Sequence, residues 1–146
     1  MKAIITESRS WIGTRFKHQG RIKYECCDCL GLLLGLNIYT KTGDALKSHD
    51  VTNYPKLIES NILLEHLDRL LEKTETIRPG NLLLIRVNNW PQHLAIVTEV
   101  DPHIIIVHAY VQARKVVEQH LPEEWKKNIV AMYEVAASSS TRRLAP

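Results

Sequence analysis

The sequence predicts an α+β fold with an antiparallel sheet, because helical patterns fill the first half of the chain and strand patterns fill the second. After a turn at Pro79-Gly80, five segments rich in β-branched residues follow one another at short spacing. Strands so close in sequence pair most simply as antiparallel neighbours. The segments are NLLLIRV, HLAIVTEV, HIIIVHAY, KVVEQHL and NIVAMYEV. We expect the N-terminal helices to pack on a roughly five-stranded antiparallel sheet.

Three helices are expected ahead of the sheet. Residues Lys2–Ile12 carry apolar side chains at helical spacing and stop at Gly13. Residues Cys29–Tyr39 are apolar on every side, and their unbranched leucines favour a buried helix over a strand. Residues Lys56–Thr74 place leucines on one face and charged side chains on the other. The two polar segments between these helices, 13–25 and 41–55, are expected to be loops.

Length and composition indicate one domain. The 146 residues are 45% hydrophobic and 24% charged, and we expect a single domain over residues 1–136 with a flexible, Ser-rich tail over 137–146. The net charge is only +3 and the basic residues are scattered, so nucleic acid is not an expected partner. No stretch approaches the ~18 apolar residues of a membrane span, and the N-terminal apolar patch is too short for a signal peptide. We therefore expect synthesis in the cytoplasm without an export signal, and no membrane partner.

All three cysteines lie in the short stretch ECCDC. An odd, crowded set does not suit a disulfide framework. Cys26 and Cys29 form a CxxC pair, which leaves a zinc site or a redox pair open, although zinc would need two further ligands from distant residues. Cys26 and Cys27 are otherwise expected to be buried as small apolar residues.

Cys29 differs from the other two through its position at the start of a predicted helix. Asp28 suits the N-cap, so free backbone N–H groups and the helix dipole would lower the pKa of the Cys29 thiol and prepare a nucleophile. Gly31 and Gly35 lie four residues apart, and on a helix they would let the backbone approach a neighbouring segment closely. A nucleophilic thiol still requires a base.

Seven histidines could supply that base. Those at positions 49, 66 and 103 fall in polar surroundings and are expected to be solvated. His93 opens one predicted strand and His108 closes the next. Facing residues of an antiparallel pair have position numbers with a constant sum, and an odd sum places these two side chains on one face. With a two-residue connection they would be diagonal neighbours, about 7–8 Å apart between backbones. A connection of two or four residues makes the sum odd and one of three makes it even, so a functional pair and two unrelated strand histidines both stay open.

Four segments, taken in order, resemble the NlpC-type cell-wall cysteine peptidases, in the branch encoded with phage tails and gene transfer agents. The segments are SWIGTRFKHQGR, CDCLGLLLGL, PQHLAIVTEV and IIIVHAY. The resemblance implies a papain-like fold with Cys29 as the nucleophile, His93 as the general base and His108 as the residue that orients the base. It implies no cofactor and no metal. It also implies a peptidoglycan stem peptide as substrate, commonly cut between D-glutamate and a diamino acid, and phage-like tail proteins as partners that deliver the enzyme to the cell wall.

The chain departs from that family's pattern at two positions. Many relatives have a tyrosine whose hydroxyl serves the oxyanion, where this chain has Phe16, so His18 and Gln19 become the candidate donors or substrate contacts. Leu30 replaces the serine that commonly follows the cysteine. A tail or particle structural protein without hydrolysis remains the rival interpretation, beside a CxxC redox or zinc protein.

Overall fold

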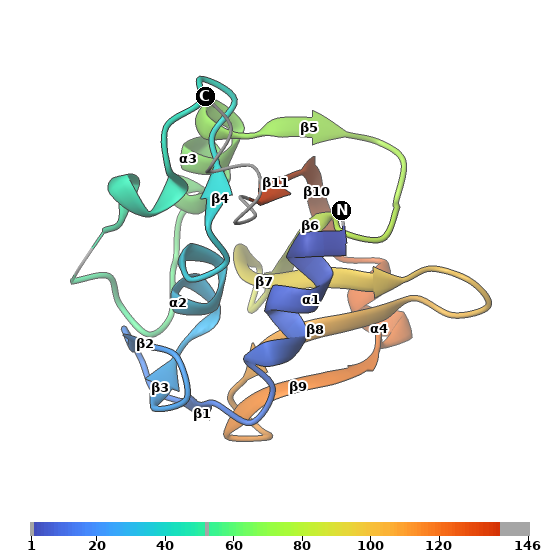
Figure 1. The fold of residues 1–146 in the computed structure, drawn as a ribbon, viewed down its shortest axis with the longest axis horizontal. Coiled ribbons are helices and arrows are strands. Elements are labelled where there is room, and N and C mark those ends of the chain that lie inside the picture. Colours follow the sequence, from blue (N-terminus) through green and yellow to red (C-terminus); the bar gives the residue numbers. More distant parts are fainter. Residues whose placement is uncertain (1, 52, 138–146) are drawn as a thin grey trace.

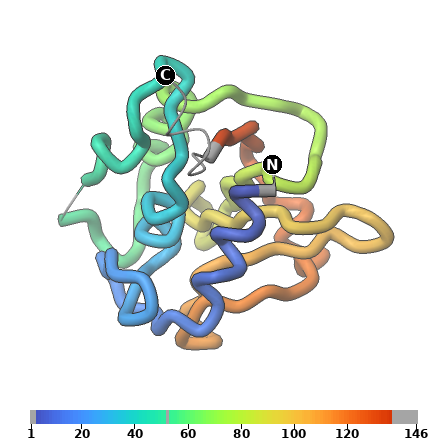
Figure 2. Tube along the Cα trace, in the orientation of Figure 1, coloured from blue at the N-terminus to red at the C-terminus, as the bar shows by residue number. Residues whose placement is uncertain are grey.

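The computed structural model describes residues 2–51 and 53–137, and one mixed sheet of nine strands dominates it (Figure 1). The sheet curls into a half-barrel (Figure 2). All neighbouring strands run antiparallel except one parallel pair, Arg15–Phe16 with Cys26–Cys27. In sheet order the strands are β2 (Arg21–Ile22), β3 (Cys26–Cys27), β1 (Arg15–Phe16), β9 (Lys115–His120), β8 (Ile105–Tyr110), β7 (Trp90–Glu99), β6 (Leu82–Val87), β10 (Ile129–Glu134) and β5 (Glu72–Thr74).

The predicted fold class, a five-stranded antiparallel sheet with papain-like helix packing, was therefore wrong. The five predicted segments do become β6 to β10, but four further strands extend the sheet at its two edges. Each of these is only two or three residues long. So short a strand cannot show the alternating pattern by which strands are found in a sequence, and its pairing comes from the segments beside it.

The three predicted helices are shorter than expected, and one further short helix lies among the strands. They are α1 (Lys2–Ser10), α2 (Cys29–Leu34), α3 (Ile62–Leu70) and α4 (Glu123–Lys126), with a 3-10 turn η1 (Leu46–His49). Gly35 closes α2, and the residues that follow form β4 (Ile38–Tyr39), which pairs with β11 (Ala136–Ala137). The end of the third predicted helix is instead the edge strand β5, paired with β10. In both places pairing with a distant segment overrides local helical propensity.

Apolar side chains cover both faces of the sheet. Helices α1, α2 and α3 pack on one face, where Leu33 and Leu67 meet Leu84 and Ile96. The opposite face carries a smaller apolar cluster around Val97, and Trp125 of α4 packs against that cluster. No helix in the described residues has both the length and the apolar character needed to cross a bilayer. The predicted tail, 137–146, lies outside the described residues except for its first alanine.

The two glycines of the second helix segment set its position, as predicted. A Cβ on Gly31 would lie 2.0 Å from the carbonyl oxygen of Gly20, and one on Gly35 would lie 2.1 Å from the ring of Trp11. Only glycine permits contacts this close. The start of α2 is thereby pressed against the chain that leads into β2.

Candidate active site

Cys29 is the first residue of α2, and Asp28 is its N-cap, as predicted. The Asp28 side chain is buried, and its two oxygens accept hydrogen bonds from several segments at once. The donors are the backbone N–H groups of Gly31 and Gln19, each at 2.8 Å, Nη1 of Arg21 at 3.1 Å and the hydroxyl of Tyr54. The start of the cysteine-bearing helix is therefore fixed by one carboxylate.

Arg21 joins this carboxylate to the loop that follows η1. Its Nε donates to Asp50 at 3.1 Å, and its guanidinium lies over the Tyr54 ring, 5.5 Å from the centroid. A planar guanidinium can bind carboxylates and stack on an aromatic ring at the same time. Asp50 and Tyr54 are thus held next to the helix start.

The Cys29 thiol lies against the backbone of β7. It donates to the carbonyl oxygen of Gln92, with an Sγ to O distance of 3.7 Å, and Gln92 directly precedes His93. Burial raises the pKa of the Cys29 thiol to about 12, and the adjacent Asp28 carboxylate raises it further, against nearby backbone N–H groups that lower it. The expectation that the helix start lowers this pKa was wrong, because burial and a neighbouring negative charge outweigh the dipole of a helix of six residues.

His93 and His108 lie on one face of the β7–β8 hairpin and are hydrogen-bonded. The distance from His93 Nε2 to His108 Nδ1 is 2.7 Å. Ile96 faces Val107, so facing positions add up to 203, an odd number. The connection spans residues 100–104, which alone would make the sum even, and a register shift between Val97 and Glu99 restores the odd value. The hairpin geometry alone left a pair and two unrelated histidines open, and the structure shows the pair, which depends on this bulge.

Both histidines are neutral in this setting. Burial lowers the pKa of His93 to about 3, and the nearby His108 lowers it further. Burial also lowers the pKa of His108 to about 4. With Cys29 protonated as well, the resting site holds a neutral thiol and two neutral imidazoles at pH 7.

Trp125 of α4 covers the histidine pair. Its ring centroid lies 5.0 Å from that of His93, 5.3 Å from that of His108 and 5.4 Å from that of Tyr110, each in an edge-on arrangement. Tyr110 stacks on His108 at 4.9 Å. Under these aromatic side chains His108 is fully buried, whereas His93 is half-buried and lines the groove. No pattern in the sequence marks Trp125, because it lies outside both predicted strands and reaches the site only through the fold.

Cys29 and His93 line the same groove, which has a volume of about 730 Å³. Its walls come from six separate segments, and its charged side chains, Lys17 and Lys56, are both basic. The Gln92 side chain fixes one wall, because it accepts from the backbone N–H of Ile58 at 2.8 Å and donates to the Val87 carbonyl. The lining residues are Phe16, Lys17, His18, Cys29, Lys56, Leu57, Val87, Asn88, Gln92, His93, Ala109, Tyr110, Val111, Gln112 and Trp125.

A second hollow, of about 620 Å³, lies between residues 39–43 and the segment around Glu72 and Glu134. Its lining among the described residues includes neither a thiol nor an imidazole. Of these two hollows, the groove lined by Cys29 and His93 is the one that holds a thiol and an imidazole.

The two candidate oxyanion donors have other partners. His18 lines the groove, but its Nε2 donates to the Tyr54 carbonyl at 2.9 Å. The Gln19 amide donates to the same carbonyl, also at 2.9 Å, and Gln19 is not among the groove-lining residues. Both side chains hold the loop at Tyr54 in this conformation. Phe16 lines the groove without a hydroxyl, so the Cys29 backbone N–H, at the start of α2, is the remaining donor expected near a bound carbonyl.

The remaining cysteines are free thiols, Cys27 buried and Cys26 half-buried. Within residues 2–51 and 53–137, no group of three or more His, Cys, Asp or Glu side chains is arranged to hold a metal ion. The chemistry open to this site is that of a thiol beside an imidazole pair.

No protein-family model matches the chain, and no curated protein matches it closely enough to count as a relative.

Proposed function

We propose that this protein is a cysteine peptidase that hydrolyses peptide bonds in peptidoglycan stem peptides. Cys29 is the nucleophile, His93 the general base and His108 the residue that orients the base. One observation carries the proposal: the thiol of Cys29, at a helix start, and His93, which is hydrogen-bonded to His108, line the same groove.

The reaction starts from neutral groups. Nε2 of His93 is engaged by His108, so Nδ1 is the nitrogen available to the groove. The thiol turns away from the Gln92 carbonyl, its sulfur attacks the substrate carbonyl carbon, and Nδ1 takes the thiol proton. His93 then gives this proton to the leaving amine as the C–N bond breaks. Water attacks the resulting thioester, His93 accepts a proton from that water, and the thiol is restored as the acid product leaves.

The groove suits an extended peptide that carries carboxylates. Lys17 and Lys56 are its charged lining residues apart from the histidines, and Leu57 and Val111 present exposed apolar side chains at its rim. Stem peptides combine free carboxylates with short apolar side chains, which matches this lining. The choice of the D-glutamyl–diamino acid bond, and delivery by a phage-like particle, rest on the resemblance of the sequence to the NlpC-type peptidases.

Digestion of purified cell wall and of defined muropeptides tests the proposal. Cys29→Ala and His93→Ala are expected to abolish cleavage while the protein still folds, because each removes a group that handles bonds or protons. His108→Ala is expected to weaken cleavage less. Cys26→Ala, which changes a thiol outside the groove lining, is the matched control and should keep full activity. Undiminished digestion by Cys29→Ala would refute the mechanism.

A structural protein of a tail or particle, without hydrolysis, is the second candidate. The observation that favours it is the direction of the thiol, which binds the Gln92 carbonyl rather than His93. Wild-type protein that binds cell wall yet releases no new amine from muropeptides would support this alternative over the peptidase.

A further inference from the structure

His108 holds a buried polar atom without a partner. The residue is 0% exposed, and its Nε2 has no hydrogen-bond partner among the described residues. Buried polar atoms in proteins are nearly always hydrogen-bonded, and an exception at a reactive site points to a function. This nitrogen lies on the far side of the imidazole from His93, whose Nε2 meets Nδ1 of His108.

The protonation of that atom decides whether His93 can act as a base. The 2.7 Å hydrogen bond between the rings contains one proton. If His108 donates it, Nδ1 of His93 carries a proton and cannot accept one from the thiol. If His93 donates it, Nδ1 of His93 is a free acceptor, and the proton of neutral His108 must then sit on Nε2. The productive arrangement thus requires a buried N–H at His108 Nε2, the atom that lacks a partner among the described residues.

Gln119 is placed to accept from that N–H. His108 faces Val117 and Ile106 faces Gln119 in the β8–β9 register. Side chains two apart on a strand share a face, so Gln119 is the diagonal neighbour of His108, at a backbone separation of about 7–8 Å that a glutamine can bridge. Gln119 is half-buried. Its amide favours the charged form of His108, although it does not complete a hydrogen bond to Nε2 in this conformation.

We infer that Gln119 is a positioning residue whose side-chain oxygen accepts the proton of His108 Nε2 and so holds the pair in its productive tautomer. A glutamine could also present its NH₂ group to Nε2 and stabilise the unproductive tautomer. During turnover, however, His93 becomes an imidazolium and must donate to His108 Nδ1. At that stage Nε2 of His108 carries a proton, and only the amide oxygen fits against it. The contact is therefore strongest when charge develops on His93, which favours the transition state over the resting state.

The inference rests on the proposed peptidase function, but one of its two tests does not depend on activity. Nitrogen chemical shifts of the imidazoles, measured by NMR on uniformly ¹⁵N-labelled wild-type protein, report which ring nitrogen carries the proton. We expect the proton of His108 on Nε2. A proton on Nδ1 of His108 would overturn the inference whether or not the protein cleaves peptides.

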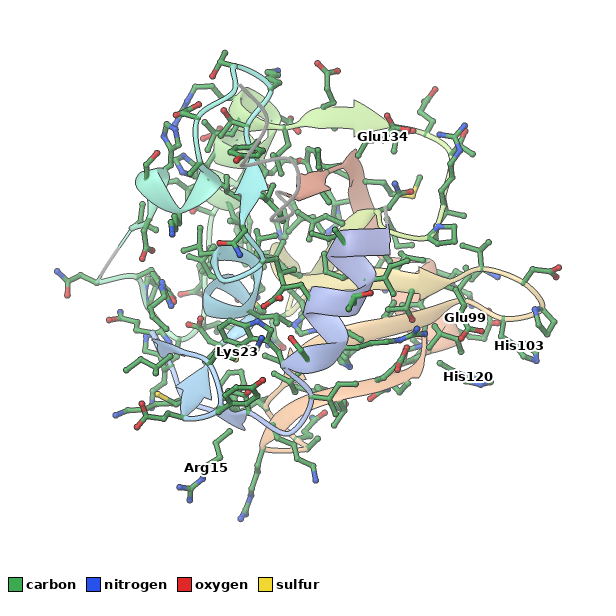
Figure 3. All side chains as sticks on the ribbon, in the orientation of Figure 1. Arg15, Lys23, Glu99, His103, His120 and Glu134 are labelled. Atoms are coloured by element: carbon green, nitrogen blue, oxygen red, sulfur yellow. The ribbon has the colours of Figure 1, made fainter. Side chains whose placement is uncertain are left out.

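The second test is kinetic and uses variants of β9. Gln119→Met keeps the length of the side chain but removes the acceptor, and kcat on a muropeptide should fall about ten-fold with little change in KM. Gln119→Glu restores an acceptor and should recover most of kcat and the Nε2–H signal of His108. His120→Asn is the matched control on the same strand, because His120 is exposed at the end of the hairpin remote from α2 and stacks with His103 (Figure 3).

The outcomes separate the two proposals. Unchanged kcat together with an unchanged His108 tautomer in Gln119→Met overturns the role of Gln119 but leaves the peptidase intact. An inactive wild-type protein overturns the peptidase, while the tautomer of wild-type His108 still decides whether the pair is arranged as inferred. If Gln119→Met does not fold, Gln119→Glu and the wild-type spectrum carry the test, and loss of the Nε2–H signal in Gln119→Glu contradicts it.

Discussion

Lowering the pH from 7 to 5 is expected to destabilise the fold by about 4 kcal/mol through the histidine pair alone. Burial holds the pKa of His93 at about 3 and that of His108 at about 4, whereas a histidine in the unfolded chain titrates near ~6.5. Above pH ~6.5 the two histidines are neutral in both the folded and the unfolded protein. As the pH falls below that value, the two histidines bind protons in the unfolded chain but stay neutral in the folded one. The free energy of unfolding therefore decreases until the pH reaches the folded pKa values.

The size of this loss follows from the difference between the unfolded and folded pKa values of the two histidines. At pH 5 each unfolded histidine has gained about 2 kcal/mol of proton-binding free energy that the folded state lacks, and the two contributions add to about 4 kcal/mol. Domains of this size are stable by only about 5–15 kcal/mol, so the loss is large. Partial solvent access to the pair would reduce it.

Urea unfolding at pH 7 and pH 5 measures this loss directly. His108→Gln removes one titrating group and should show about half the wild-type pH dependence, whereas the exposed control His103→Gln should keep all of it. A change below about 1 kcal/mol in the wild-type protein, or an undiminished change in His108→Gln, would show that the pair is not buried and neutral as described.

Three further perturbations probe the site and its support. Alkylation of Cys29 by iodoacetamide should be slow at pH 7 and accelerate toward pH 10, because burial keeps the thiol protonated. Asp28→Asn removes the adjacent charge but keeps an acceptor for the helix cap, so it should accelerate alkylation at pH 8. An alkylation rate that mass spectrometry finds unchanged in this variant would contradict the role of the Asp28 charge. Gly31→Ala should destabilise the protein by about 3 kcal/mol or more, since its Cβ would lie 2.0 Å from a backbone carbonyl oxygen. Gly43→Ala, at a position with a positive φ but open space around it, should cost about 1 kcal/mol in the same urea assay. Trp125→Ala should admit water to the histidine pair and raise the pKa of both imidazoles, seen as an upward shift of their NMR titrations; titrations that stay at the wild-type pH would mean that the tryptophan does not shield them.

Local residue patterns were sufficient for the cysteine side of the site. The start of α2 at Cys29, its cap at Asp28 and the close approach at Gly31 are all properties of a short stretch of chain, where residue type and spacing act within one helical turn. The five long strands could be located for the same reason, because short runs rich in β-branched residues, separated by turn signals, are visible in the sequence.

The histidine side of the site depended on the tertiary structure. That the two strand histidines could share a face was an inference from the sequence, but a bulge near Val97 decided it, and nothing local marks that bulge. The neutral state of the thiol and the imidazoles was missed as well. Protonation depends on burial, and burial here comes from Trp125 and from the groove walls, to which six separate segments contribute.

The sequence by itself thus determined where a nucleophile could stand and which strands form the centre of the sheet, since these depend on contacts along the chain. The tertiary structure decided the size and mixed character of the sheet, because its edge strands are too short to carry a pattern of their own. It also decided which face the histidines share, what charge the site carries and which atom of His108 is left without a partner. Each of these depends on the packing of residues far apart in sequence, which spacing along the chain does not encode.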